Sequence, residues 1–285
     1  MSPLRQKFID EMKLRNFSVA TVSSYTGAVA ALAGHYHRSP DKISEQEIKQ
    51  YLLFLTEEKK LTYSTCNVAI SAFKLFYNDI LGQGKILLKI PLRKTTKRLP
   101  EVLSTKEVER IFQVEMNPKH RVLLMTTYAA GLRVSEVTRL KIKDIESQRN
   151  LIRVDQGKGK KDRYTVLSPR LLEELRSHYV RFRPQEFLFY GTDIKKPLSR
   201  SAAQRIYYKA KKKAGITRGG GIHCLRHCFA THMLEAGMDI RTLQIILGHA
   251  SLSSTAMYLH ITMKHLGKTQ SPFDLLDISD FKNPT

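Results

Sequence analysis

Acidic residues are scarce in this sequence. Its 285 residues include 26 Asp and Glu but 48 Lys and Arg, which gives a formal net charge of +22. This surplus excludes the mixed surface charge of an ordinary cytosolic enzyme and indicates a polyanionic partner. Residues 1–98 hold 16 basic and 8 acidic residues, and residues 99–285 hold 32 and 18. Because both parts are basic, we expect a nucleic acid bound along the whole molecule, although charge alone does not distinguish DNA from RNA.

Cysteine is also rare. The only cysteines are Cys66, Cys224 and Cys228, which excludes the disulfide framework of small secreted domains and favours a reducing compartment. No apolar run approaches the ~18 residues of a membrane span, and the first residues lack the apolar core of a secretory signal. We therefore expect a soluble, cytoplasmic protein that folds around its own apolar core.

The first ninety residues predict helices. Apolar side chains recur at spacings of three and four over residues 18–36, as on the buried face of a helix. Ser44 and Glu47 form a capping box before a second apolar pattern. A third helix is expected over residues 62–81. Residues 1–90 thus predict a small, all-helical N-terminal domain.

The composition changes at residues 91–100, where two prolines bracket several cations and few apolar residues. This is the composition of a linker, and we place the domain boundary there. In the second domain, residues 101–270, apolar alternation over residues 150–167 predicts a β-hairpin with a cationic tip. The rest is helical in pattern, with helices expected over about residues 118–130, 169–182, 199–213, 222–236, 240–247 and 254–264. The fold class is mainly α, with a mixed α+β second domain that carries a small hairpin sheet.

Several chemically capable residues stand at breaks in these patterns, beside glycines or shortly after them, and Tyr258 is added to them as a nucleophile candidate. If they converged, they would supply charge stabilisation, proton donors and a weak nucleophile, which is what attack on a phosphodiester requires. Their spacing alone does not show that they converge. The candidates are Arg133, Lys158, His223, Arg226, His249 and Tyr258.

The order of these motifs resembles that of a known family. The segments are Ala-Gly-Leu-Arg-Val-Ser-Glu at 130–136, Gly-Lys-Gly at 157–159, His-Cys-Leu-Arg-His-Cys-Phe-Ala-Thr-His at 223–232, Leu-Gly-His at 247–249, and Tyr258. Together they resemble the complete motif series of the tyrosine recombinases, or phage integrases. The resemblance covers about residues 6–266 and is strongest to the Xer recombinases and the compact integrases of bacterial mobile elements.

This resemblance implies a DNA recombinase of the bacterial cytoplasm. Such an enzyme cuts and rejoins double-stranded DNA through a 3′-phosphotyrosyl intermediate and a four-way junction, with no metal, nucleotide or other cofactor. A homotetramer on paired sites is implied, with a second recombinase or accessory proteins as further partners. The resemblance also makes residues 1–90 a core-binding domain, residues 101–270 the catalytic domain, and residues 271–285 a tail that couples protomers or is simply mobile.

The resemblance further implies a role for each motif residue that handles the phosphate. Tyr258 is the nucleophile, and Arg133 and Arg226 clamp the non-bridging oxygens, because a guanidinium binds phosphate with two donors and keeps its charge. His249 donates to the phosphate. Glu136, three residues after Arg133 and so on the same side of a helical turn, supports that arginine or a neighbouring ligand.

The same resemblance implies that two further residues transfer protons. Lys158 is the general acid that protonates the leaving 5′-oxygen, with Lys160 beside it as the alternative. His223 is a general base or a phosphate ligand. A base is useful because tyrosine, with a pKa near ~10, is almost fully protonated at neutral pH.

Other interpretations of the same residues stay open. Cys224, Cys228 and His232 follow one another at helical spacing, so a zinc site is conceivable, although helix packing explains the cysteines better. The basic run Lys209–Lys213 is interpreted as a solvated helix end. For the whole protein, the alternatives are a type IB-like topoisomerase, which would relax supercoils without recombining sites, and a DNA-binding protein that has lost the reaction.

Overall fold

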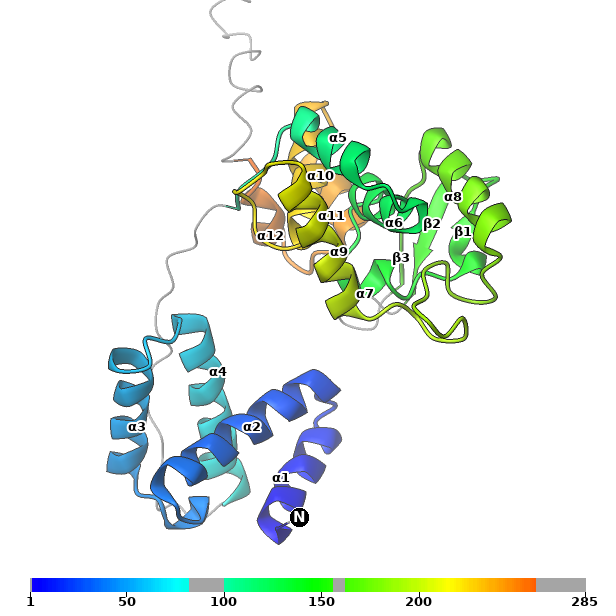
Figure 1. The fold of residues 1–285 in the computed structure, drawn as a ribbon. Coiled ribbons are helices and arrows are strands. Elements are labelled where there is room, and N and C mark those ends of the chain that lie inside the picture. Colours follow the sequence, from blue (N-terminus) through cyan, green and yellow to red (C-terminus); the bar gives the residue numbers. More distant parts are fainter. Residues whose placement is uncertain (1, 82–99, 156–161, 260–285) are drawn as a thin grey trace, which may run out of the picture. The chain divides into compact units, whose positions relative to one another are not determined.

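The computed structural model describes residues 2–81, 100–155 and 162–259, and the chain divides into two compact units, residues 1–97 and 98–285 (Figure 1). Four sequence-based predictions fall outside the described residues: Lys158, Lys160, nearly all of the 91–100 linker, and the 271–285 tail. Within the described part of the chain, no helix is long and apolar enough to cross a membrane.

The N-terminal unit is helical, as the apolar spacing predicted. Ser18, Ser44 and Thr62 each accept a backbone N–H at the start of a helix, and Ser44 and Glu47 complete the predicted capping box. Its elements are α1 Pro3–Leu14, α2 Val19–Tyr36, the 3₁₀ turn η1 Pro40–Lys42, α3 Glu45–Glu57, α4 Tyr63–Lys74 and the π-helical segment η2 Leu75–Ile80.

The helix expected over residues 62–81 changes its winding at Leu75. The wider π turn of η2 continues α4 and buries Leu75, Phe76, Tyr77 and Ile80. Phe76 packs edge-on against Phe8 of α1, with ring centroids 5.2 Å apart. These four side chains all belong to the apolar core of the N-terminal unit.

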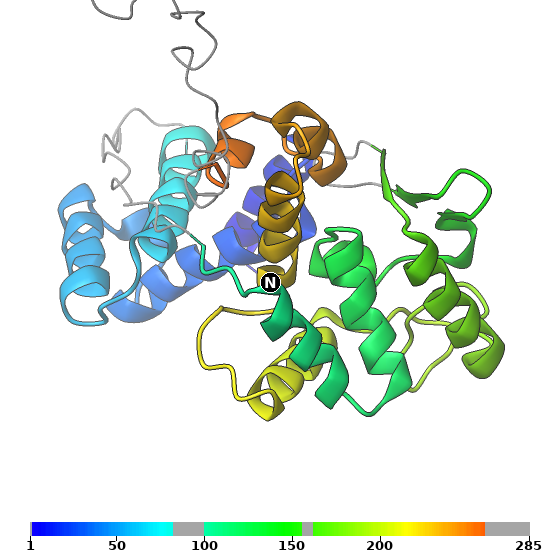
Figure 2. The same cartoon turned by 90° about the horizontal axis from the view of Figure 1, so that it is seen from above.

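The C-terminal unit consists of helices and one small antiparallel sheet (Figures 1 and 2). In both views the sheet lies at one side of the unit and α12 at the other. The elements are α5 Thr105–Val114, α6 Pro118–Ala129, α7 Val134–Val137, η3 Ile142–Asp144, β1 Ile145–Glu146, β2 Leu151–Val154, β3 Arg163–Val166, α8 Pro169–Phe182, α9 Arg200–Lys213, α10 His223–Glu235, α11 Ile240–Leu247 and α12 Ser253–Ala256.

The predicted hairpin is confirmed by β2 and β3, which pair antiparallel with Leu151 opposite Val166. A third strand, β1, extends the sheet beyond β2. It spans only two residues, too few for an alternating pattern to show in the sequence. The helix expected from residue 254 onward ends earlier, at Ala256, so Tyr258 lies in a turn and not on a helix.

Gly131 closes α6 and turns the chain toward the residues that follow. Its φ is +60°, and a Cβ at this position would overlap the ring of Phe229 on α10.

We expect Gly131→Ala to lower the free energy of unfolding by about 2 to 3 kcal/mol, from backbone strain and overpacking together. Urea denaturation would measure this. Gly191→Ala, at an open position, is the control, and equal stability of the two variants would contradict the expectation.

Candidate active site

Glu136 is the centre of a cluster of arginines. Its carboxylate accepts the backbone N–H of Arg133 at 2.8 Å and the Arg133 Nη1 at 2.7 Å. The contact expected from the three-residue spacing is thus present. These bonds cap the short helix α7, which begins directly after Arg133.

Arg163, which the sequence analysis did not single out, pairs with the same carboxylate. Its Nη1 and Nη2 donate to the two Glu136 oxygens, each at 2.8 Å. Arg226 approaches as well, with Nη1 3.7 Å from Glu136. The Glu136 side chain is only 6% exposed. Burial opposes its ionisation, but hydrogen bonds and charge from Arg163 and Arg133 prevail and lower its pKa to about 2.

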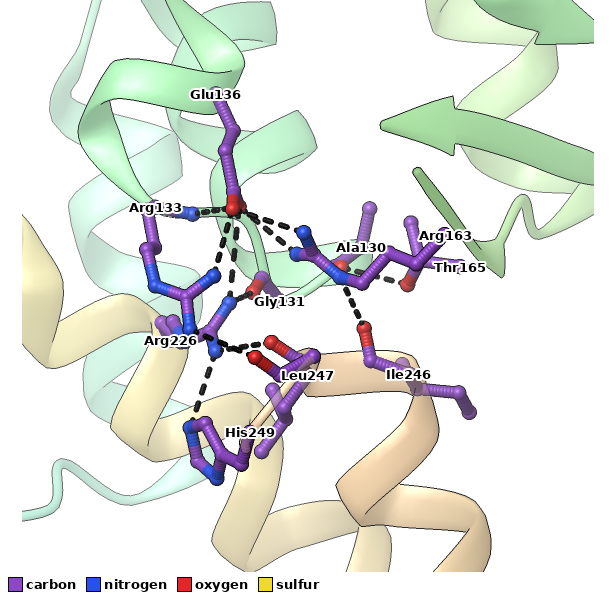
Figure 3. Close-up of polar contacts among 11 residues, drawn as sticks. Ala130, Gly131, Arg133, Glu136, Arg163, Thr165, Arg226, Ile246, Leu247 and His249 are labelled. Carbon is purple, nitrogen blue, oxygen red and sulfur yellow. Dashed lines mark hydrogen bonds and ion pairs between the residues drawn. The ribbon is translucent and has the colours of Figure 1, made fainter. Parts of the chain in front are cut away.

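The same three arginines hold the carboxyl end of α11 (Figure 3). Arg163 Nε donates to the carbonyl of Ile246 at 2.8 Å, and Arg226 Nη2 to that of Leu247 at 2.6 Å. Arg133 Nη2 donates to the carbonyl of Gly248 at 3.3 Å. Carbonyls at the end of a helix have no partner within the helix and carry partial negative charge, so guanidinium groups suit them.

Arg226 is fully buried, at 0% exposure. Its Nη1 also donates to the carbonyl of Gly131 at 2.7 Å. Burial, and then the charge of Arg133, lower its pKa to about 9, so it stays largely protonated at neutral pH. Its Nε is buried and has no hydrogen-bond partner within the described part of the chain. A buried donor of this kind is costly unless a ligand completes it.

His249 follows the αL residue Gly248, where α11 ends. Its Nε2 lies 3.1 Å from Arg226 Nη2, and its Nδ1 lies 2.9 Å from the Thr255 hydroxyl. Burial, followed by the charge of Arg226, lowers the pKa of His249 to about 4. A guanidinium only donates, so Nε2 of the neutral ring accepts and the proton lies on Nδ1. The predicted donation from His249 to a phosphate therefore stays a prediction, and it requires a change of protonation.

Tyr258 is packed against two histidines. Its hydroxyl lies 2.9 Å from Nδ1 of His227, and its ring is nearly parallel to that of His249, with centroids 6.4 Å apart. Burial raises the pKa of Tyr258, while Arg226 and Arg133 oppose this shift. Burial also lowers the pKa of His227 to about 4, so at neutral pH the hydroxyl faces a neutral imidazole, whose Nδ1 accepts the hydrogen bond in the Nε2–H tautomer.

The predicted base, His223, lies one helical turn before His227 at the exposed start of α10. The two rings meet edge to face, with centroids 4.6 Å apart. Surrounding protein atoms lower the pKa of His223, and Arg226 and Arg133 lower it further. His227, rather than His223, contacts the nucleophile candidate. The spacing of four residues between the two histidines was the available signal.

The basic run at the end of α9 was wrongly interpreted as wholly solvated. Lys209, Lys212 and Lys213 are exposed, but Lys211 is buried. Its Nζ donates to three successive carbonyls, those of Thr217, Arg218 and Gly219. The loop before α10 is thus held by a buried ammonium group, which periodicity alone could not reveal.

The two cysteines of α10 pack into the protein core. Cys224 and Cys228 are buried, with Sγ atoms 3.9 Å apart, and Cys228 Sγ accepts the Leu103 N–H at 3.2 Å. The Nδ1 of His232 lies 2.8 Å from the hydroxyl of Tyr128. These contacts agree with helix packing as the explanation of the two cysteines.

We expect the depressed pKa values of His227 and His249 to make folding pH-dependent. Both are near 4 in the folded protein, against ~6.5 in the unfolded chain. Between these values the unfolded chain binds more protons, so stability falls as the pH falls from about 6.5 toward 4. Urea denaturation is expected to give an unfolding free energy about 2 kcal/mol lower at pH 5 than at pH 7, after discounting for partial exposure. His249→Gln should weaken this dependence, and equal stability at the two pH values would contradict it.

Two family models match this sequence, one in each of the two units of the chain. Residues 101–265 match the phage integrase family, and residues 4–85 match the phage integrase N-terminal SAM-like domain. The chain belongs to the phage integrase family. This result confirms the resemblance to the tyrosine recombinases that the sequence motifs indicated.

Similar members of this family include integrases and Xer proteins. A putative integrase/recombinase of Sinorhizobium fredii is 43% identical over 97% of this chain and 90% of its own length. The tyrosine recombinase XerC of Lactobacillus delbrueckii is 32% identical over 92% of this chain and 96% of its own. The crystal structure of XerA recombinase superposes with a TM-score of 0.55 at 29% identity, covering 95% of this chain and all of that one.

The fold is also shared with more distant integrase structures. One is XerH recombinase bound to its palindromic difH substrate in a post-cleavage complex, with a TM-score of 0.72 at 22% identity over 91% of this chain and 82% of that one. Another is a lambda integrase tetramer bound to a Holliday junction, with a TM-score of 0.73 at 19% identity over 90% and 76%.

Proposed function

We propose that this integrase-family protein is a site-specific DNA recombinase with Tyr258 as its nucleophile. The observation that carries the proposal is the cluster of Arg133, Arg163 and Arg226 around the single carboxylate of Glu136. Three positive charges against one negative leave a surplus in a largely buried place. That surplus, together with the Nε of Arg226, which has no partner among the residues that the structure describes, suits the non-bridging oxygens of a scissile phosphate.

In the proposed reaction the Tyr258 oxygen attacks the phosphorus, and the bond to the 5′-oxygen breaks. A 3′-phosphotyrosyl link forms, and the 5′-oxygen leaves as a hydroxyl after taking up a proton. One phosphodiester replaces another, so the energy needed for rejoining is kept in the protein–DNA bond. Arg133 and Arg226 stabilise the charge that develops on the non-bridging oxygens.

Two proton transfers accompany this exchange. The hydroxyl of Tyr258 is hydrogen-bonded to His227 in the unbound protein, and we assign to His223 the role of base or phosphate ligand once DNA is bound. We assign protonation of the leaving oxygen to Lys158, five residues before Arg163. Tyr258 is only 1% exposed, so DNA binding has to open access to its hydroxyl before attack.

We further propose double-stranded DNA as the substrate and a homotetramer as the active assembly. The net charge of +22 supports a long DNA contact, and the similar lambda integrase was solved as a tetramer on a Holliday junction. Residues 1–90 would serve as the core-binding domain and residues 271–285 as the coupling tail. We also propose a cytoplasmic location, which this substrate and the bacterial relatives support.

Incubation with a supercoiled plasmid separates recombination from the topoisomerase alternative. The plasmid carries two copies of a site selected beforehand, from randomised duplexes, by covalent attachment to the wild-type protein. Deletion or inversion of the segment between the sites is expected. Relaxation with no recombined product, at equal rate on a plasmid without sites, would favour the topoisomerase.

A further inference from the structure

We propose that Arg163 is a positioning residue that orients the phosphate clamp, which consists of Arg133 and Arg226. This inference rests on the function proposed above. Arg163 begins β3, and its side chain is only 8% exposed. It is not one of the residues to which the motif resemblance assigns a role. Its contacts nevertheless reach the two features that Arg133 and Arg226 also approach, which are the Glu136 carboxylate and the end of α11.

The first connection is to Glu136. Arg163 binds that carboxylate with two parallel hydrogen bonds of 2.8 Å, a geometry that fixes both oxygens at once. The same oxygens receive the guanidinium and the backbone N–H of Arg133. Arg163 therefore fixes the carboxylate against which Arg133 is oriented.

The second connection is to the carboxyl end of α11. Arg163 Nε donates to Ile246, the first of three successive carbonyls that the three arginines bind. Its aliphatic part lies beneath Gly248, where an added Cβ would stand 2.6 Å from Arg163 Cδ. Arg163 thus fixes the position of the carboxyl end of α11, and His249 follows directly after that end.

The guanidinium of Arg163 is used by acceptors within the protein. Its Nε, Nη1 and Nη2 each donate to a protein acceptor (Figure 3). Without it, Glu136 loses its bidentate partner, and Arg226, whose Nη1 lies 3.7 Å away, is the next cation that can approach the carboxylate. Arg226 would then be drawn toward Glu136 and away from Gly131 and Leu247. Arg163 therefore acts through the other arginines rather than on the phosphate.

The test compares two forms of the scissile phosphate in a nicked duplex that carries the selected site. One form is the natural diester, and the other is a methylphosphonate, which lacks the negative charge and so depends less on a cationic clamp. Rates of covalent adduct formation are measured for the wild type, Arg163→Met and Arg163→Lys. Arg149→Met is the control, because Arg149 is 65% exposed and its side chain contacts Glu146 and the ring of Tyr164 rather than Glu136 or the end of α11.

Arg163→Met is expected to form adduct roughly 100-fold more slowly than the wild type on the natural diester. On the methylphosphonate the deficit should shrink to less than about 10-fold, because less charge has to be stabilised. Arg163→Lys should recover only part of the activity, because one ammonium cannot reproduce the planar fork. Arg149→Met should match the wild type on both substrates.

Equal deficits of Arg163→Met on the two substrates would overturn the inference, because a purely structural loss does not depend on phosphate charge. Wild-type rates in Arg163→Met would overturn it too, while leaving the recombinase assignment intact. If the wild-type protein itself forms no adduct with any member of the randomised pool, the proposed function fails first and this inference with it.

Discussion

Replacing Arg226 by lysine is expected to slow covalent adduct formation by about 100- to 1,000-fold. Arg226 uses separate nitrogens for Gly131 and Leu247, and its Nε has no hydrogen-bond partner among the described residues. A lysine has one nitrogen for all of these partners. The site also lowers the arginine pKa to about 9, and the same burial would push the pKa of a lysine, which starts at ~10.4, toward neutrality.

Adduct yield on nicked DNA measures this loss, with Arg139→Lys as the matched control. Arg139 is exposed, and lysine keeps its charge, so that variant should resemble the wild type. Because Arg226 also holds α10 against the end of α11, a thermal melt should accompany the assay. A wild-type rate in Arg226→Lys would remove this residue from the phosphate clamp.

Replacing Glu136 by glutamine is expected to have the second largest effect. Glutamine keeps the shape of the side chain but removes the negative charge shared by three arginines. Leaving buried charges without their partner typically costs about 3 to 5 kcal/mol. We therefore expect a comparable fall in the free energy of unfolding at pH 7, and an adduct rate lowered by at least about 100-fold.

Urea denaturation and adduct formation together test this expectation. Glu146→Gln is the control, because its arginine pair is exposed and such pairs contribute about 1 kcal/mol or less. In a double-mutant cycle, Glu136→Gln and Arg163→Met should be strongly non-additive, because they remove the same bidentate contact. Additive losses would show that the two residues act independently.

Local patterns predicted most helix starts in this protein. The predicted capping box at Ser44 is formed, because it depends on residues only three positions apart. The hairpin followed from alternation in the same way. The helix that was expected to contain Tyr258 ends at Ala256 instead. The tyrosine turns inward to His227 there, a tertiary contact that periodicity does not encode.

The active site was only partly predictable. The glycine breaks marked Arg133, Arg226 and His249, but their meeting at one helix end depends on packing between segments about a hundred residues apart, such as Arg226 with Gly131. Arg163 was missed because its partner Glu136 lies 27 residues away on another element. Lys211 was misinterpreted for the same reason, since its acceptors are loop carbonyls that carry no residue-type signal.

The most direct test of the central assignment is trapping of the protein on DNA. Wild-type protein and Tyr258→Phe are incubated in EDTA with nicked duplexes that carry the selected site, and protein–DNA complexes that survive denaturation are counted. The phenylalanine ring preserves the packing of Tyr258 against His249 and removes only the hydroxyl. A metal-independent adduct with the wild type and none with Tyr258→Phe is the expected result. An adduct that survives the substitution, or none with the wild type on any duplex, would contradict Tyr258 as the nucleophile.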